Sequence, residues 1–534
     1  MKKFHPAILS VVSGLLLFAA WPVSPLTFLI FIGFIPLFWM EQQGMRRRPF
    51  FLWIYLAMLI WNVSTTWWIM NSTVPGGMAA ILANSLLMSL PWLAFYNIKK
   101  RMGATVGYIS FILSWLTFEY IHLNWDLSWP WLTLGNAFAT QPNWVQWYEY
   151  SGTSGGSLWI LMTNIVLFLV IINQLKKRKL NVRLTSLLLG LLIFPFLLSV
   201  YIKGQRSVFK ERTPNNIVVV QPNIDPYIKF ETGQENAQLN NLLQLSESMI
   251  DSNTRLVIWP ETAIPVAIDE AFVTQHAFLQ PVFAMLKRHP NTRLLTGIEG
   301  FRFFDEANKT PYSRRYQKSD QYYDAYNSAA LIDTSRVQLY HKSKLVPGVE
   351  TLPGFLKFLD SWFEQFGGTT GGYAKQEDRT VLIADNSNYK IAPSICYESI
   401  YGEFMSEYVR KGATLIAVIT NDGWWSETPG YRQHMNYARL RAIETRRWVA
   451  RSANTGISCF IDPLGNVYQP QPWDKAAAIK HQVPDTNGII TAYAASGDVI
   501  SKVAIVLTLL LVLWNIFLII KSFINRAKKP VLSK

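Results

Sequence analysis

The chain has 534 residues, of which 50% are hydrophobic and only 16% are charged, a composition that excludes an ordinary soluble protein. The formal net charge of +15 arises from residues 1–202 and 500–534, because the segment between them holds 31 basic and 31 acidic residues. The basic excess therefore indicates membrane topology, and it does not support a nucleic-acid-binding protein.

Apolar runs dominate the first part of the chain and return at its end, and most reach the roughly 20 residues needed to cross about 30 Å of hydrocarbon. They lie at 8–23, 26–40, 50–70, 78–97, 104–121, 157–173, 184–202 and 502–520. The first two runs are short and are separated by Trp21-Pro22, so they could form one re-entrant hairpin, or the first could be a signal peptide. No convincing small-residue cleavage site follows, and further spans come directly after, which argues against a signal peptide.

Lys and Arg residues gather at alternate ends of these runs and so orient the chain. Basic clusters follow the second, fourth, sixth and last runs, and Lys2 and Lys3 precede the first. The loops 71–77 and 122–156 hold no Lys or Arg. The positive-inside rule then predicts about eight transmembrane helices, both termini in the cytoplasm and residues 203–501 outside.

From Asn216 onward, short β-type runs alternate with amphipathic stretches, which predicts an α/β domain layered as an αββα sandwich. Strands are predicted at 217–220, 256–259, 294–297, 329–332, 381–384, 391–395 and 415–419, and helices at 234–251, 270–288, 398–411 and 431–447. The charged, Tyr-rich stretch 299–325 is predicted to be a surface loop or lid. We divide the chain into a seven-helix membrane bundle (1–202), an extracytoplasmic domain (203–499), and a final span with a basic tail (500–534).

Three segments carry residues suited to catalysis, each at the end of a predicted strand. Glu261 follows the buried run ending at Pro260, Lys342 follows the run ending at Tyr340, and Cys396 ends the run 391–395. A helix is expected to begin at Cys396, and a helix N-terminus lowers a thiol pKa and offers N–H groups to an oxyanion. This is the geometry that a nucleophile elbow needs.

These ordered segments resemble the nitrilase, or carbon–nitrogen hydrolase, superfamily, whose triad is Glu, Lys and Cys in this order along the chain. The segments Thr420–Trp425 and Arg451–Gly456 are also similar to that superfamily. Seven spans, a nitrilase-like domain and one last span resemble the apolipoprotein N-acyltransferase family, as do Trp129–Leu132 and Val219–Asn223. One departure is clear: this family commonly has Phe-Gly before the glutamate after the lysine, where this chain has Gly348 and Val349.

The family resemblance implies that Glu261 is the general base, that Lys342 stabilises an oxyanion and that Cys396 takes an acyl chain as a thioester. It implies that a phospholipid donates its sn-1 acyl chain. It also implies that the N-terminal amine of a diacylglyceryl-cysteine apolipoprotein accepts this chain. Further implied roles are orientation of the lysine and the amine by Glu350 and Glu398, and lining of the acyl path by Tyr397; structural salt bridges and ordinary packing are the alternatives.

The same resemblance implies no cofactor and no metal. It places the protein in the bacterial inner membrane, in contact with the lipid bilayer, with the catalytic domain on the periplasmic side. We expect a monomer.

Other functions remain open from the residues alone. A membrane-anchored nitrilase-type amidase that hydrolyses a C–N bond would use the same triad, with water in place of the amine. A Cys–His hydrolase would use His434 or His341, although His434 lies in a predicted helix where a surface role is commoner. A transporter is disfavoured because the runs hold almost no charges and show no repeat. The motifs of zinc enzymes are missing from the sequence.

Overall fold

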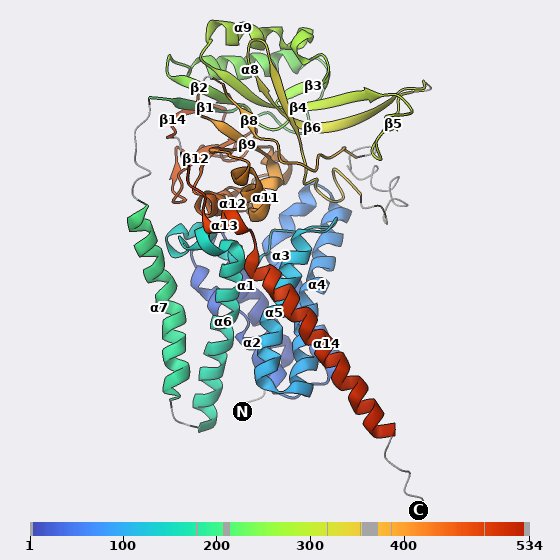
Figure 1. The fold of residues 1–534 in the computed structure, drawn as a ribbon, viewed down its shortest axis with the longest axis vertical. Coiled ribbons are helices and arrows are strands. Elements are labelled where there is room, and N and C mark those ends of the chain that lie inside the picture. The colour runs from blue at the N-terminus through green and yellow to red at the C-terminus, as the bar shows by residue number, and fades with distance from the viewer. Residues whose placement is uncertain are drawn as a thin grey trace, which may run out of the picture.

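The computed structural model describes residues 4–527 except 178–179, 207–213, 318, 353, 355–371, 386, 485 and 487. Within the described residues, six helices are long and apolar enough to cross a membrane. They are α3 (Arg47–Thr66, continued by a 3-10 turn to Asn71), α4 (Val74–Met102), α5 (Ala104–Leu123), α6 (Tyr148–Lys177), α7 (Val182–Gln205) and α14 (Val499–Ala527). Figure 1 shows them as a bundle below a mixed α/β domain, as the sequence predicts.

The first two predicted runs form shorter apolar helices, α1 (Pro6–Ala19) and α2 (Ile35–Gln42), joined through a 3-10 turn at Thr27–Phe31. Both pack one face against the bundle, where Leu17 of α1 and Leu37 of α2 have no exposed surface. At the other end of the first part, Gly152 kinks the start of α6 with a φ of +59°, and a Cβ there would collide with the Tyr493 ring. Glycine at this position therefore serves the packing of the bundle against the domain.

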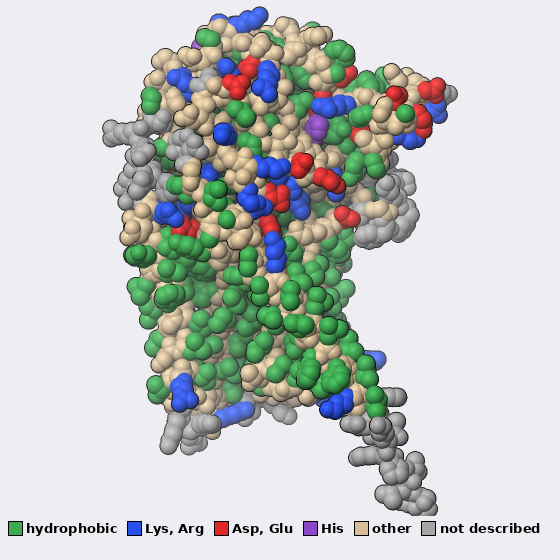
Figure 2. Space-filling view, viewed as in Figure 1, with side chains coloured by type: hydrophobic (Ala, Val, Ile, Leu, Met, Phe, Trp, Pro, Cys, Tyr) green, Lys and Arg blue, Asp and Glu red, His purple; other side chains and the backbone are tan. Residues whose placement is uncertain are grey.

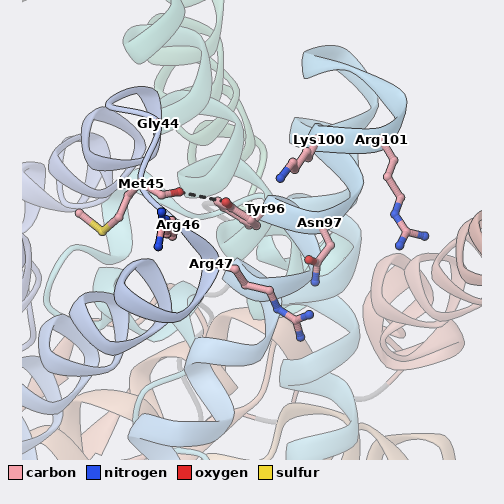
Figure 3. A pocket seen from close by; sticks show the side chains of 8 residues that line it. All are labelled: Gly44, Met45, Arg46, Arg47, Tyr96, Asn97, Lys100 and Arg101. Atoms are coloured by element: carbon pink, nitrogen blue, oxygen red, sulfur yellow. Dashed lines mark hydrogen bonds between the residues drawn. The ribbon is translucent and has the colours of Figure 1, made fainter.

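The end of the bundle far from the α/β domain is basic, and the surface between the two is largely hydrophobic (Figure 2). At this end a cavity of about 540 Å³ lies between the start of α3 and the end of α4 (Figure 3). Its cationic lining residues are Arg46, Arg47, Lys100 and Arg101. Helix α4 starts beside the domain, where the Asn71 side chain donates to the Trp425 carbonyl, and runs for 29 residues to this basic end.

Two sheets stacked face to face form the core of the α/β domain. The larger has the order β14-β1-β2-β4-β6-β5, with β3 beside β4 and β7 beside β6, and the smaller has the order β13-β12-β11-β10-β9-β8. The strands of the larger sheet are β1 (Asn216–Gln221), β2 (Thr254–Ile258), β3 (Ile264–Asp269), β4 (Arg293–Phe304), β5 (Arg314–Arg315), β6 (Tyr322–Ile332), β7 (Val337–His341) and β14 (Ala477–Gln482). Those of the smaller are β8 (Leu382–Ile383), β9 (Lys390–Ile395), β10 (Leu415–Thr420), β11 (Trp448–Ala453), β12 (Cys459–Ile461) and β13 (Val467–Tyr468).

Helices cover both outer faces of this sandwich, which gives the predicted αββα layering (Figure 1). Helices α8 (Glu235–Glu247) and α9 (Gln280–Arg288) lie on the larger sheet, and α11 (Gly402–Arg410) and α12 (Pro429–Thr445) lie between the smaller sheet and the bundle. The β1 side chains alternate accordingly: Val218 and Val220 pack toward α8, while Ile217 and Val219 pack toward the smaller sheet.

The prediction of a loop or lid at 299–325 is wrong at both ends of that stretch. Strand β4 continues to Phe304, and β6 already begins at Tyr322, so a long hairpin projects from the domain (Figure 1). Cross-strand aromatic pairs such as Phe303 opposite Tyr323 stabilise it, a contact that no local composition reveals.

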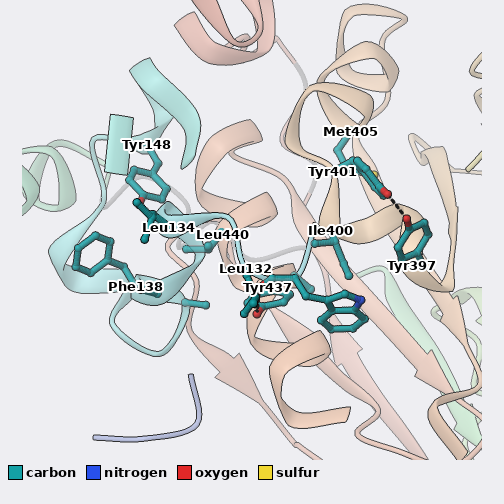
Figure 4. Packing of buried hydrophobic residues seen from close by; sticks show 14 of the residues in the cluster. Leu132, Leu134, Phe138, Tyr148, Tyr397, Ile400, Tyr401, Met405, Tyr437 and Leu440 are labelled. Carbon is teal, nitrogen blue, oxygen red and sulfur yellow. Dashed lines mark hydrogen bonds between the residues drawn. The ribbon is translucent and has the colours of Figure 1, made fainter. Parts of the chain in front are cut away.

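The loop between α5 and α6 attaches the domain to the bundle. The Trp21 indole donates to the Tyr437 hydroxyl, which in turn donates to the carbonyl of Trp131. Figure 4 shows loop residues such as Leu132 and Phe138 packed near α12 and the turn that contains Tyr397. This Trp-rich loop therefore supports the domain directly, since Trp131 is only 2% exposed.

Candidate active site

Cys396 lies at a sharp turn between β9 and a short 3-10 helix (Cys396–Ile400), and only then does α11 begin. Its φ is +54°, a conformation that costs free energy for a residue with a side chain and that occurs at nucleophile elbows. The expected α-helix at Cys396 is therefore replaced by a strained turn. The expected lowering of the thiol pKa is also wrong: burial raises it, and the Glu261 carboxylate raises it further.

Glu261 follows β2 and is 7% exposed. Its Oε1 accepts from Asn327 Nδ2 at 2.7 Å and from Lys342 Nζ at 3.1 Å, and its Oε2 accepts from the Asn421 N–H at 3.1 Å. The turn comes so close to β4 that a Cβ on Gly297 would lie 2.7 Å from the Glu261 main chain. The carboxylate is thus held at one place beside the Cys396 thiol, whose pKa it affects.

Lys342 follows β7, is 1% exposed, and lies between two carboxylates. Its Nζ donates to Glu350 Oε1 at 2.7 Å as well as to Glu261. Burial alone lowers the pKa of this ammonium, but the Glu261 and Glu350 carboxylates outweigh burial and hold that pKa well above its usual value. Lys342 is therefore a cation at neutral pH, close enough to Cys396 to favour its thiolate.

Glu350 keeps its contact with Lys342 although Gly348 and Val349 precede it. Gly348 has a φ of +78°, and the resulting turn also lets Glu350 Oε2 accept from the Val346 N–H at 2.8 Å. The unusual pair thus leaves the glutamate in position to orient the lysine.

Glu398 contacts groups other than Lys342, which it was expected to orient. Glu398 is fully buried and accepts from the N–H groups of Ile395, Ser343 and Lys344 and from the Tyr340 hydroxyl, so it organises the turns around the lysine and the cysteine and does not orient Lys342 directly. The Tyr397 hydroxyl donates to the Ser128 carbonyl at 2.8 Å. Tyr397 thereby ties the elbow to the loop between α5 and α6.

Two polar groups at the site, Asn327 and Lys229, were not singled out by sequence reasoning. Asn327, in β6, bridges Glu261 and Glu350. Lys229 is fully buried and donates to the Glu261 carbonyl at 3.2 Å and to Thr262 Oγ1 at 2.9 Å; burial lowers its pKa to about 8. His434 is also fully buried, contrary to the expected surface role. The sequence does hold a signal that Lys229 is buried, because this lysine lies within the apolar run Tyr227–Phe230.

The two histidines considered for a Cys–His pair have other partners. His341 Nε2 lies 2.8 Å from Glu270, on the far side of β6, and His434 Nε2 lies 3.1 Å from the carbonyl oxygen of Cys396. Among the described residues, no group of His, Cys, Asp and Glu could hold a metal ion. The arrangement supports nucleophilic chemistry: a buried thiol, a carboxylate to take its proton, and a fixed cation for an oxyanion.

Comparisons with known proteins find matching family models and relatives. A family model described as carbon–nitrogen hydrolase matches residues 216–486, and one described as the apolipoprotein N-acyltransferase N-terminal domain matches residues 13–166. Apolipoprotein N-acyltransferase from Chlorobaculum tepidum is 32% identical over 521 residues, with 94% of each chain covered, and that from Pseudomonas putida is 26% identical over 481 residues, with 87% of each covered. Among solved structures, an amidase of the nitrilase superfamily from Nesterenkonia AN1 matches 54% of this chain and 96% of its own, with 15% identity and a TM-score of 0.35.

The fold and the site therefore define a nitrilase-type enzyme domain built onto a bundle of membrane helices. The chain belongs to the apolipoprotein N-acyltransferase family of the carbon–nitrogen hydrolase superfamily, which confirms the resemblance of the sequence to both. It is an enzyme of that family and a bacterial membrane protein.

Proposed function

We propose that this protein moves the sn-1 acyl chain of a phospholipid, through a thioester on Cys396, to the N-terminal amine of diacylglyceryl-cysteine lipoproteins. The observation that carries this proposal is the buried ion-pair set of Lys342 with Glu261 and Glu350, next to a cysteine in a strained elbow. The names of the relatives support the choice of acyl transfer over hydrolysis of a C–N bond.

In the first half-reaction, the Glu261 carboxylate takes the proton of the Cys396 thiol, and the sulfur attacks the ester carbonyl. A base is needed because burial keeps the thiol protonated at rest. The Lys342 ammonium, together with backbone N–H groups beside the cysteine, stabilises the oxyanion. The C–O bond then breaks, Glu261 returns the proton to the leaving alkoxide, and a lysophospholipid departs.

In the second half-reaction, the amine attacks the thioester carbonyl, and Glu261 accepts an amine proton. The C–S bond breaks and the sulfur leaves as a thiolate that regains its proton from Glu261, so an amide and free enzyme remain. A thioester suits this step because an amine attacks it more readily than an ester. The two half-reactions make the cycle ping-pong.

The architecture supports the proposed lipid substrates and orientation. The site lies in the domain at one end of an apolar bundle, and the opposite end carries the basic residues (Figure 2). By the positive-inside rule, that basic end and both termini face the cytoplasm, which puts residues 203–499 on the periplasmic side of the inner membrane. A monomer suffices in this proposal, because one chain supplies Glu261, Lys342 and Cys396.

The proposal can be tested with purified protein in detergent and a phospholipid carrying a labelled sn-1 chain. Label should appear on the wild-type protein, resist denaturation and disappear on treatment with neutral hydroxylamine. It should be absent from Cys396→Ala and present on Cys459→Ala, because the second cysteine lies in β12, where its charged neighbours are Arg451 and Arg439. Addition of a diacylglyceryl-cysteine peptide should then move the label onto the peptide amine.

Two results would count against the proposal. No label and no lysophospholipid would remove phospholipid as the donor and favour the anchored amidase. Release of the label as a free fatty acid, with none transferred to the peptide, would make the protein a lipase-like hydrolase.

A further inference from the structure

His434 is a fully buried residue that the chemistry above does not use. It lies in α12, where its Nδ1 is 2.9 Å from Asp422 Oδ1 and its Nε2 is 3.1 Å from the carbonyl oxygen of Cys396. The imidazole therefore bridges a buried carboxylate and the main chain of the nucleophile.

The partners of Nε2 decide where a hydrogen must be. A carbonyl oxygen only accepts hydrogen bonds, so Nε2 carries a hydrogen when it bonds to Cys396. Ser399 Oγ also donates to this carbonyl at 2.8 Å, and it lies 2.9 Å from Nε2. Two donors thus converge on one carbonyl oxygen, that of the strained residue.

The carboxylate behind the imidazole is itself held firmly. Asp422 has no exposed surface, and its Oδ2 accepts from Arg451 Nη2 at 2.7 Å while its Oδ1 accepts from Thr420 Oγ1 at 2.9 Å. Arg451 is equally buried, and its Nη2 lies 3.0 Å from His434 Nδ1. The ring orientation is therefore fixed from the side opposite the cysteine.

Aromatic rings exclude water from this network. The rings of Trp131 and Trp425 lie edge-on to His434, with centroids 5.9 Å and 5.5 Å away. Hydrogen bonds in such a low-dielectric setting are stronger and polarise their neighbours. Trp131 comes from the loop between α5 and α6, so the bundle contributes to the shell around the histidine.

The carbonyl of Cys396 and the N–H of Tyr397 belong to one peptide unit. A hydrogen bond received by the carbonyl draws charge toward oxygen and makes the N–H a better donor. The N–H of the residue after the nucleophile is one donor of the oxyanion hole in a nucleophile elbow. A hydrogen bond to the Cys396 carbonyl therefore strengthens the Tyr397 N–H, on the side where the oxyanion forms.

We propose that His434, held by Asp422 and Arg451, is a positioning residue that polarises the Cys396–Tyr397 peptide and strengthens the Tyr397 N–H as an oxyanion donor. This inference rests on the acyl transfer proposed above, in which Glu261 takes the thiol proton. His434 never exchanges a proton with substrate.

Two substitutions of similar size separate the two ends of the imidazole. In His434→Gln, the amide nitrogen can reach the Nε2 position and still donate to Cys396; in His434→Asn, the shorter amide keeps the contact with Asp422 and loses the one with Cys396. Each variant is assayed for the burst of p-nitrophenolate from p-nitrophenyl butyrate, which reports acylation through an oxyanion. Alkylation of the thiol by iodoacetamide, which forms no oxyanion, is the parallel readout.

We expect His434→Asn to acylate about tenfold more slowly, less than the loss of about 10²–10³ seen when an oxyanion donor is removed outright. Its alkylation rate should stay within about twofold of wild type, and His434→Gln should stay within about threefold in both assays. An acylation rate of His434→Asn equal to that of the wild type would overturn the inference. So would a parallel loss of acylation and alkylation, because that would mean that His434 only maintains the shape of the turn.

The artificial ester keeps this test separate from the proposed function. A wild-type protein that reacts with p-nitrophenyl butyrate but takes no label from phospholipid would overturn the phospholipid donor, and the ratio of variant to wild-type rates would still decide the role of His434.

Discussion

Replacement of Glu350 by glutamine should slow acylation, because one amide cannot satisfy the donors that one carboxylate now serves. Glu350 Oε1 accepts from Lys342 Nζ at 2.7 Å, and Oε2 accepts from the Val346 N–H at 2.8 Å. Glutamine offers a single oxygen, so either the ammonium or the backbone N–H faces an NH₂ group. An unsatisfied buried group costs about 1–3 kcal/mol, and a neutral acceptor binds an ammonium about 1 kcal/mol more weakly than a charged one.

If about 1–2 kcal/mol of this loss falls on the transition state, Glu350→Gln should acylate roughly 5- to 30-fold more slowly. The assay is single-turnover labelling with the labelled phospholipid, with the melting temperature measured in the same detergent. Glu270→Gln is the matched control, since Glu270 is a buried carboxylate directly after β3 that pairs with His341 and Arg302. A Glu350→Gln rate within twofold of wild type, or an equal loss in the control, would refute the role assigned to Glu350.

Lys229→Met removes the ammonium that donates to the Glu261 carbonyl. Because a charge-assisted hydrogen bond is lost, single-turnover acylation should slow about tenfold, and an unchanged rate would contradict this. Burial raises the pKa of Glu444 to about 7 from 4.5, so the folded protein binds more protons than the unfolded chain and its melting temperature should fall as pH rises between these values. Glu444→Gln should weaken that slope, and an unaltered slope would exclude Glu444 as its source. Tyr437→Phe leaves the Trp21 indole N–H and the Trp131 carbonyl unpaired. This loss should lower the free energy of unfolding by about 2 kcal/mol and the melting temperature by roughly 5 °C. A melting temperature equal to that of the wild type would show that these groups find other partners.

The candidate triad could be predicted from the sequence because Glu261 and Cys396 directly follow runs of strand-forming residues and Lys342 lies two residues after Tyr340. That local pattern is visible in Val257–Pro260 and in 391–395, and the chain order of Glu, Lys and Cys limits the family further. The contacts of Glu398 could not be predicted in the same way. Its partners Ser343 and Lys344 lie more than 50 residues away, so only the packing of the two sheets brings them together.

Local rules also failed where burial decides the outcome. A helix start at Cys396 suggested a thiol of low pKa, yet enclosure between two sheets and a membrane-side loop raises that pKa. His434 has the helical setting of a surface residue, but α12 is covered on one side by the smaller sheet and on the other by the bundle. Periodicity reports which residues share a face, and it does not report what covers that face.

The sequence by itself determined the apolar runs, the basic asymmetry of their flanks and the layered domain between the last two spans, because these follow from hydrophobicity and charge along the chain. Only the tertiary structure decided how the reactive groups meet: Glu261 and Lys342 come from the larger sheet and Cys396 from the smaller. The physical reason is that a pKa or a hydrogen-bond partner depends on groups distant in sequence, which become neighbours only when the sheets pack and exclude water.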